Sequence, residues 1–496
     1  MIIKKINEVF IQITDCDEYS LESYFKIKDE ECFFKPSFKM GIWDGFIRYY
    51  DRNTRLLPIG LFPQLQTYIK DNNIECDYDF NNFNNFTSND ITDFIVNNGL
   101  DVSRNPYPFQ LKSIQRALNY KRGVIQSPTG SGKSLIIFIL CRYLLNNNKK
   151  ILIITPQVDL VNQLFNDFIS YGWGDCDKFV NALHGKVKLY IHNKPVLIST
   201  YQSLSILDKS IFKTFDSVII DEVHTAKALS IKEILIQCEN AEYRIGLTAT
   251  MHKKDIDKFT IYSYVGKKIF DIPIKTLQVE GFLTPLVVNV ITFKYPEELK
   301  STYKLEFDKE YNFISKIPKR NELLKHILNQ INPTENILIL CKNIVQVKEA
   351  YNYLQENIKG YSLYKIQGDV KSENRDEIIK NVENNQSCII VATYGTMSTG
   401  RNVKRLHHVI LFSPYKSDIK VLQSIGRGTR LHETKKLLQI WDIVDDLSYY
   451  DQDDVTIKSK KKLKENHLLQ HSKLRLNYYK DKEFPVKKTT VNYNDI

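Results

Sequence analysis

The sequence lacks the features that mark a secreted, membrane-spanning or zinc-binding protein. Its eight cysteines include no C-x-x-C pair and no other zinc-like spacing, so we interpret them as reduced core thiols of a cytoplasmic protein. No apolar run approaches the ~20 residues that a helix needs to span a bilayer. The opening segment, Met1–Ile6, holds two lysines but is soon followed by Asn7 and Glu8, so we expect no signal peptide.

Positive charge is abundant and unevenly distributed. The 496 residues, enough for three or four domains of roughly 100–200 residues each, carry a net charge of +11. Residues 456–496 contain eleven Lys or Arg against four Asp or Glu. Such a segment favours contact with nucleic-acid phosphates, and its candidate contacts are Lys460, Lys461 and Lys462. The alternative is a solvated or disordered lysine tail, although leucines between 463 and 476 suggest that part of it is helical and packs on the body.

A phosphate-binding loop is the most informative local feature. It lies between the apolar pair Val124–Ile125 and a helix-like stretch, and it consists of Ser127, Pro128, Thr129, Gly130, Ser131, Gly132, Lys133 and Ser134. Two glycines allow the tight backbone path on which N–H groups converge on an anion. Lys133 would contact the outer phosphates, and the Ser134 hydroxyl would bind Mg²⁺. Ser127 stands where the common pattern has glycine. The alternative, a Gly/Ser turn with a stray lysine, is disfavoured by the rest of the chain.

A second acidic element follows a predicted buried strand, Phe215–Ile220. The strand runs into Asp221, Glu222, Val223 and His224. We expect Asp221 to hold Mg²⁺ through its water shell and Glu222 to orient and deprotonate the attacking water. An acidic pair after a strand is also common at helix caps. The catalytic interpretation is supported by the position of this pair, which lies downstream of the phosphate loop and of the predicted strands Ile151–Thr155 and Val196–Ser199.

Two arginines lie far along the chain, in the segment Gln423–Arg430. Arg427 and Arg430 are three residues apart, which would place them on one helical face if the segment is helical. Together with Gln423 they could grip the γ-phosphate and stabilise the transition state, as an arginine finger does. A basic surface turn is the alternative, and the position of this segment after Thr393–Asn402 argues against it.

Taken in order, these elements resemble superfamily 2 helicases and translocases over about residues 105–445. The resemblance implies an α/β protein with two tandem RecA-like parallel-sheet domains. It also implies that Gln110 reads the adenine of ATP, that Gly400 and Asn402 belong to the ATP site, and that His224, Thr248 and Thr250 couple hydrolysis to domain movement. The nucleic-acid contacts that it implies are Thr155, Pro156, Thr200, Gln202, Lys342, Gly368 and Thr393. Two departures, Asn402 in place of an aspartate and D-E-V-H in place of D-E-A-D, argue mildly against an RNA helicase.

The flanking segments resemble the UvsW family of bacteriophage helicases. The similarity includes Phe34–Gly45, Leu56–Leu61 and Val421–Gln423, and it covers nearly the whole chain. It implies an ATP- and Mg²⁺-dependent DNA helicase that regresses forks, migrates junctions and unwinds D-loops and R-loops in recombination, repair and replication. The implied partners are branched or single-stranded DNA, RNA–DNA hybrids and other replication or recombination proteins, in the host cytoplasm if the gene is phage-borne.

We expect four segments along the chain. They are a small α+β nucleic-acid-binding domain (1–100), a first RecA-like domain with the phosphate loop (109–284), a second RecA-like domain (285–455) and a basic helical C-terminal extension (456–496). In the first segment Trp43, Tyr49 and Tyr50 interleave with arginines, of which Arg48 is our candidate phosphate contact. The aromatics are more often core residues in a domain of this size.

Three other functions remain as alternatives. An RNA helicase would share the ATP site, and a restriction-type translocase would share the motor, although only 66 residues follow Arg430 and we see no nuclease pattern. A nucleotide-gated DNA clamp could dispense with the hydrolytic set, whereas Glu222 and both arginines are present. The choice of ATP over GTP rests on Gln110.

Overall fold

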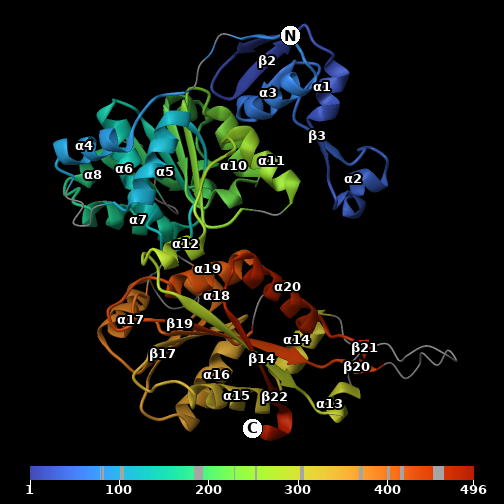
Figure 1. Cartoon of the computed structure of the whole chain (residues 1–496), viewed down its shortest axis with the longest axis vertical. Helices are drawn as coiled ribbons and strands as arrows, with labels where there is room; N and C mark the ends of the chain where they lie inside the picture. The colour runs from blue at the N-terminus through green and yellow to red at the C-terminus, as the bar shows by residue number, and fades with distance from the viewer. Residues whose placement is uncertain are drawn as a thin grey trace, which may run out of the picture. The chain divides into compact units, whose positions relative to one another are not determined.

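The computed structural model shows two compact units, each built around a seven-stranded sheet (Figure 1). The described residues are 1–78, 80, 83–100, 106–183, 194–227, 229–251, 254–301, 307–367, 372–398, 403–413, 418–450 and 463–496. One unit comprises Met1–Pro128 and Gly132–Ile272, and the other comprises Pro273–Ile496 with Thr129–Ser131. No helix within these described ranges is long and apolar enough to cross a membrane.

A small α/β domain opens the first unit. Its mixed sheet has the order β5-β2-β1-β6, and its core gathers isoleucine, leucine and aromatic side chains that include the buried Tyr50. The elements are β1 (Ile2–Lys5), β2 (Phe10–Thr14), α1 (Glu18–Tyr24), β3 (Lys26–Lys28), α2 (Pro36–Lys39), β4 (Phe46–Arg48), β5 (Leu56–Pro58), α3 (Phe62–Asp71) and β6 (Asp77–Tyr78). Tyr49 and Tyr50 are therefore core residues, as the conservative interpretation of the aromatics predicts.

This domain ends near residue 80, which is earlier than the sequence suggested. Helix α4 (Ser88–Asn97) packs on α5 (Pro108–Tyr120), and its Ile91 and Ile95 belong to the core beneath the following sheet. The boundary at residue 100 is therefore wrong. Its physical reason is that the apolar face of α4 is buried against the next domain and not against the small sheet.

The small domain is fixed to the first parallel-sheet domain by buried polar contacts. The Tyr49 hydroxyl lies 3.0 Å from the Thr260 hydroxyl and donates to the Ile256 carbonyl at 3.2 Å. Arg122 donates from Nη2 to the Glu8 carboxylate at 3.0 Å. Both contacts lie within the first unit, so the two domains form one body.

The first parallel sheet has the strand order β13-β7-β12-β11-β8-β10-β9. Side chains alternate between its two faces: Ile151 and Ile153 pack against α5, α6 and α7, whereas Leu152 and Ile154 pack in the core with α10 and α11. The strands are β7 (Arg122–Gln126), β8 (Ile151–Thr155), β9 (Val180–Leu183), β10 (Val196–Thr200), β11 (Ser217–Ile220), β12 (Tyr243–Thr248) and β13 (Lys268–Asp271), and the further helices are α6 (Lys133–Asn146), α7 (Val158–Ser170), α8 (Cys176–Phe179), α9 (Tyr201–Leu204), α10 (Leu229–Gln237) and α11 (Asp255–Tyr264).

The second parallel sheet has the order β16-β17-β15-β18-β19-β14-β22 and is likewise covered on both faces. Its strands are β14 (Leu286–Lys294), β15 (Ile337–Cys341), β16 (Ser362–Ile366), β17 (Cys388–Thr393), β18 (His408–Leu411), β19 (Leu438–Asp446) and β22 (Val486–Asn492). Its helices are α12 (Ile274–Val279), α13 (Glu297–Ser301), α14 (Phe307–Ser315), α15 (Lys319–Leu328), α16 (Ile344–Asn357), α17 (Ser372–Asn384), α18 (Tyr394–Ser398), α19 (Asp418–Gly428) and α20 (His467–Asp481). The strands predicted at 337–341, 389–393 and 408–412 are confirmed within a residue.

The C-terminal segment is part of this second sheet and not an appended helix. Strand β22 pairs with β14 in parallel, Val288 opposite Val486, and α20 lies against the sheet, while β20 (Tyr449–Tyr450) and β21 (Leu463–Lys464) form a short ribbon before it. The buried Glu310 carboxylate accepts hydrogen bonds from the backbone N–H groups of His467 and Leu468, which places a negative charge at the start of α20. The expected helical extension is therefore corrected to a helix and an edge strand of the second domain.

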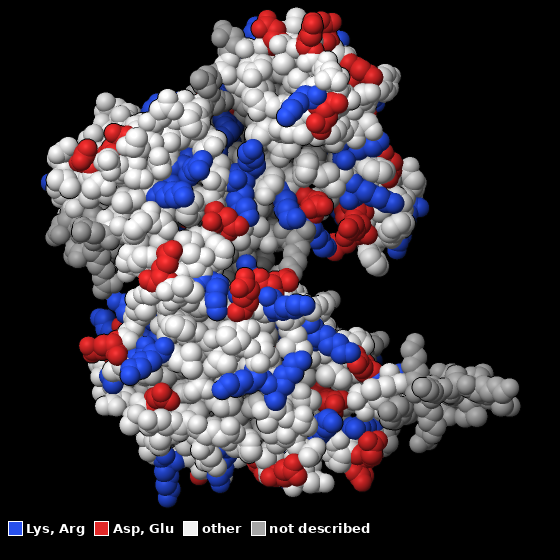
Figure 2. Space-filling view, viewed as in Figure 1, with Lys and Arg blue, Asp and Glu red and all other residues white. Residues whose placement is uncertain are grey.

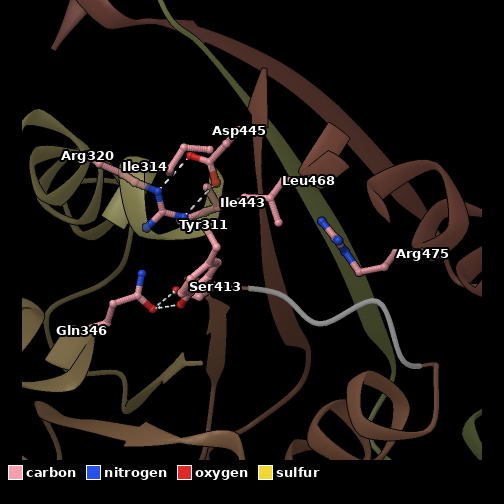
Figure 3. Close-up of a pocket in the computed structure, with 9 residues that line it drawn as sticks. All are labelled: Tyr311, Ile314, Arg320, Gln346, Ser413, Ile443, Asp445, Leu468 and Arg475. Atoms are coloured by element: carbon pink, nitrogen blue, oxygen red, sulfur yellow. Dashed lines mark hydrogen bonds and ion pairs between the residues drawn. The ribbon is translucent and has the colours of Figure 1, made fainter. Parts of the chain in front are cut away.

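Two buried ion pairs hold this arrangement together. Arg320 donates to both Asp445 carboxylate oxygens at 2.8 and 2.9 Å (Figure 3). Arg475 of α20 donates to both oxygens of Asp442 at 2.9 Å. Each arginine lines a cavity of about 10 Å³, room for one water molecule, and the Nη1 of each has no hydrogen-bond partner in the described part of the chain. Burial makes these pairs costly to break.

Candidate active site

The phosphate loop lies where β7 ends and α6 begins, as the sequence predicts. Gly130 has φ +87° and Gly132 has φ +79°, left-handed conformations that favour glycine. The N–H of Ser127 donates to the Thr248 carbonyl at 2.9 Å, which anchors the start of the loop to the neighbouring strand β12. Helix α6 starts at Lys133, so its N-terminal N–H groups and positive dipole end follow the loop directly.

Gln110 packs directly against this loop. Its Oε1 accepts from the backbone N–H of Tyr107 at 2.8 Å, which fixes the amide orientation at the start of α5. A Cβ placed on Gly132 would lie only 2.4 Å from the Gln110 Nε2, so a side chain there would displace the Gln110 amide. Gln110 and the phosphate loop are thus neighbours, although 22 positions separate Gln110 from Gly132.

The Lys133 ammonium lies close to the acidic element. Its Nζ is 3.9 Å from the Glu222 carboxylate and donates to the Ser127 carbonyl at 3.3 Å. Glu222 is at φ +50°, an unusual conformation for a non-glycine residue, and its N–H donates to the adjacent Asp221 carboxylate at 3.0 Å. The fold thus brings a lysine from one strand end and two carboxylates from another into one site.

The two neighbouring carboxyl groups are electrostatically distinct. Burial, together with the charge of Glu222, raises the pKa of Asp221 to about 6. Burial also opposes ionisation of Glu222, but Lys133, His224 and Thr248 outweigh it and hold the pKa of that carboxyl below its usual value. Glu222 is consequently the more acidic member of the pair and is the last to be protonated as pH falls, so it carries the charge needed to orient a water molecule.

A hydrogen-bonded network joins Glu222 to the end of β12. His224 Nδ1 lies 3.0 Å from the Thr248 hydroxyl and 3.3 Å from the Glu222 carboxylate. The Thr248 hydroxyl is also 2.9 Å from the Thr250 carbonyl and 3.3 Å from Glu222 Oε2. Because one hydroxyl has one proton, Thr248 can donate to only one of these acceptors at a time. Of the three candidate coupling residues, His224 and Thr248 therefore contact the candidate base directly, and Thr250 is joined to it through Thr248.

The donors near the loop suit a magnesium ion. The Ser134 hydroxyl and the Asp221 carboxylate are hard oxygen ligands of the kind that Mg²⁺ prefers. A cation beside Asp221 would offset the burial that raises its pKa. The Ser134 hydroxyl lies 2.8 Å from the Tyr171 hydroxyl. Tyr171 follows α7 in no recognisable motif, so sequence reasoning missed it.

The second unit carries the remaining candidates for the triphosphate. Gln423 and Arg427 are on α19, one turn apart, but the helix ends at Gly428 and Arg430 follows it. The expectation of two arginines on one helical face is therefore wrong. At the end of the helix the Thr429 N–H donates to the Gly426 carbonyl, three residues back, at 3.4 Å, and the Thr429 hydroxyl donates to the same carbonyl at 2.8 Å.

The candidate nucleic-acid contacts of the first unit lie after strands β8 and β10. The Thr155 and Thr200 side chains are buried; the Thr155 hydroxyl donates to the Gln157 carbonyl at 3.2 Å, and Thr200 caps α9. Pro156 is half-buried and Gln202 is exposed. These threonines shape the two strand ends, and Gln202 is the member of the set that offers an exposed side chain.

In the second unit, Lys342 follows β15 and Thr393 is the last residue of β17. The Lys342 ammonium lies 4.1 Å from the centre of the Tyr311 ring, and the Thr393 hydroxyl accepts from the Thr396 N–H at the start of α18. Six further candidates lie outside the described residues: Gly368, Gly400, Asn402, Lys460, Lys461 and Lys462.

Arg48 of the small domain is engaged in ion pairs. Its guanidinium lies 3.1 Å from Glu22 and donates to Asp44 at 3.1 Å, and Arg52 also contacts Glu22. Figure 2 shows acidic side chains interspersed with basic ones on the visible face of this domain. Contact between Arg48 and a phosphate would have to compete with these two carboxylates.

Family models match three parts of the chain. Residues 3–80 match the N-terminal domain of the DNA helicase UvsW, residues 103–253 match the res subunit of type III restriction enzymes, and residues 319–432 match the helicase conserved C-terminal domain. The first match ends where the small domain ends in the structure.

Whole-chain relatives agree with these matches. The chain is 31% identical to the ATP-dependent DNA helicase uvsW of Enterobacteria phage T4 over 96% of this chain and 97% of that protein. It is 23% identical to the probable helicase D10 of Escherichia phage T5 over half of each chain. The crystal structure of T4 UvsW matches it with a TM-score of 0.50 at 28% identity over 99% of both chains.

Proposed function

Because this chain belongs to the UvsW family of ATP-dependent DNA helicases, we propose that its ATP hydrolysis drives the remodelling of branched DNA. The observation that carries the proposal is the contact between the base candidate Glu222 and Thr248, which lies on a different strand. A change of protonation or charge at Glu222 alters its contact with Thr248 directly and reaches Thr250 through the Thr248 hydroxyl, a route by which hydrolysis can move the chain.

We assign the hydrolytic roles to residues of the first unit. Lys133 and the loop N–H groups bind the phosphates, Glu222 orients and deprotonates the attacking water, and Gln110 reads the adenine. Ser134 and Asp221 would hold Mg²⁺, which supplies charge neutralisation on the phosphates when bound. The position of Gln110 against Gly132 supports its role.

The assignments in the second unit rest on sequence and family. Gln423, Arg427 and Arg430 are proposed to act on the same triphosphate, the arginines as fingers that stabilise transition-state charge. Gln423 and Arg427 lie one turn apart on α19 and Arg430 lies two residues beyond its end, an arrangement compatible with a shared target. Gly400 and Asn402 are proposed members of this site.

Branched DNA is the proposed substrate, with RNA–DNA hybrids in R-loops as a second form of it. The segments that follow β8 and β10 are proposed to bind the DNA strand, with Gln202 of α9 as an exposed polar contact. Other replication or recombination proteins are proposed partners, and the cytoplasm of a host cell is the proposed location. An RNA helicase or a DNA clamp would use the same fold, so the substrate must be tested directly.

The test is ATP turnover with single-stranded DNA, fork DNA and RNA side by side, followed by remodelling of a synthetic fork and a four-way junction. We expect DNA to stimulate turnover and the fork and junction to be converted only with ATP. Glu222→Gln should abolish both activities, whereas Glu239→Gln, which removes a partly exposed ion pair with Lys213, should not. Stimulation by RNA alone, or DNA binding without turnover, would contradict the proposal.

A further inference from the structure

A cavity of about 280 Å³ lies within the first unit, between the small domain and the first parallel-sheet domain. Its size is near the lower end of ligand pockets, which range over about 300–1,000 Å³. The small domain contributes Phe62, Tyr78 and Phe80, and the sheet domain contributes Tyr120 and Arg122 among others. None of the residues that line it has a role in the proposed ATP site or DNA contacts.

Aromatic rings form much of the cavity wall. Phe62 packs with Tyr78 and Phe80 at centroid distances of 5.3 and 4.8 Å, and Phe83 packs edge-on against Tyr120 at 5.2 Å. Tyr78 and Phe83 are 40% and 46% exposed, so ring surface remains accessible at the cavity. Flat aromatic surfaces of this kind stack favourably on a nucleobase.

Among the described residues that line the cavity, the charged ones are two cations. Arg122 and Lys267 line it, and no Asp or Glu is among the lining residues that the structure describes. The Arg122 side chain is 11% exposed, with Nη2 donating to Glu8, but its buried Nη1 has no hydrogen-bond partner in the described part of the chain. The Glu8 carboxylate also forms an ion pair with Lys5, so its single negative charge does not neutralise both Lys5 and Arg122. A guanidinium with a free N–H edge is a strong ligand for phosphate oxygens.

We propose that this cavity binds one nucleotide unit, with the base against the aromatic walls and the phosphate at Arg122 and Lys267. The nucleotide comes either from solution or from the free end of a DNA strand. The aromatic rings can stack on the base, the two cations can bind the phosphate, and the volume is enough for a single nucleotide.

This site is separate from the phosphate loop. Arg122 is the first residue of β7, and the loop begins after its last residue, Gln126. Five residues of strand span about 17 Å. A nucleotide in the cavity would therefore contact the opposite end of the strand that carries the ATP loop.

Binding is tested on the full chain, with the ATP site filled by a nonhydrolysable ATP analogue and Mg²⁺. Saturation-transfer NMR with thymidine monophosphate should show the base protons in contact with protein, and thymidine without phosphate should bind more weakly. Phe83→Ala and Lys267→Gln, both at accessible positions, should each weaken binding about fivefold or more. Tyr19→Ala, which removes a 74% exposed ring elsewhere on the small domain, is the matched control and should leave binding unchanged.

The source of the nucleotide is identified by photocrosslinking. 5-Iododeoxyuridine at the free end of a fork strand should crosslink to Tyr78 or Phe83 if strand ends occupy the cavity; monophosphate binding without that crosslink would assign it to free nucleotides. Absence of monophosphate binding at millimolar concentration, or equal weakening by Tyr19→Ala, would overturn the proposal. Retained binding in a protein that fails the fork assay would overturn the proposed helicase substrate alone.

Discussion

The buried ion pair between Arg475 and Asp442 makes the C-terminal helix α20 part of the second domain's stability. Both side chains are 1% exposed and share two hydrogen bonds of 2.9 Å, and the Tyr479 hydroxyl donates to the same carboxylate at 2.8 Å. Arg475→Ala leaves a buried carboxylate with one hydroxyl donor. Breaking a buried pair in this way costs about 3–5 kcal/mol, a large part of a domain's ~5–15 kcal/mol.

A second variant distinguishes the cost of an unpaired buried charge from the cost of lost packing. Arg475→Met with Asp442→Asn removes both charges but keeps an amide oxygen for the Tyr479 hydroxyl. We expect this double variant to regain more than half of the stability lost in Arg475→Ala, because no unpaired charge stays buried. Lys473→Ala is the control on the same helix; its ion pair is exposed and should contribute no more than about 1 kcal/mol.

The assay is urea unfolding followed by tryptophan fluorescence. The chain has three tryptophans, and Trp441 lies on β19 next to Asp442. With Trp43 and Trp173 replaced by phenylalanine, the signal reports the second domain alone. An Arg475→Ala midpoint equal to that of Lys473→Ala would refute the reasoning. Deleting residues 456–496 would remove Arg475 as well, so such a truncation cannot test DNA binding in isolation.

Four further predictions concern the catalytic site and the second domain. Lys133→Ala should lower ATP turnover about 10²–10³-fold, checked by steady-state kinetics, because it removes the cation nearest the phosphates. Glu222→Gln should retain ATP binding but lose turnover about 10²–10⁴-fold, measured by nucleotide-binding titration and single-turnover hydrolysis; normal turnover would exclude it as the base. Arg427→Ala should bind nucleotide yet hydrolyse it at least about 10³-fold more slowly, and near-normal turnover would contradict the finger role. Burial lowers the pKa of His407 to about 4, and its Nδ1 accepts a hydrogen bond from the Asn336 N–H. The second domain should therefore lose stability as pH falls from about 6.5 towards 4, because the unfolded chain then binds a proton that the folded one does not. The urea midpoint should fall over this range, and His407→Asn should make it less dependent on pH.

Much of the site could be predicted because its chemistry is encoded in short local segments. The loop around Lys133 follows the apolar pair Val124–Ile125, which lies on β7. The Asp221–Glu222 pair follows the predicted strand Phe215–Ile220, of which β11 covers Ser217–Ile220. The Glu222–Thr248 contact could not be derived in this way. It depends on β11 and β12 lying side by side, a pairing between segments 26 residues apart.

The sequence by itself determined the nucleotide chemistry and the two alternating parallel sheets, because glycines, carboxylates and buried strands leave local patterns. Only the tertiary structure decided the ends of the domains. Strand β22 has the sequence VKKTTVN and is largely exposed. Its lysines suit an edge strand, but they also remove the apolar pattern by which a strand is predicted from sequence. Its pairing with β14 joins residues nearly two hundred positions apart, and α20 is held by an ion pair to β19. Such long-range packing depends on the assembled fold and not on any pattern within the segment itself.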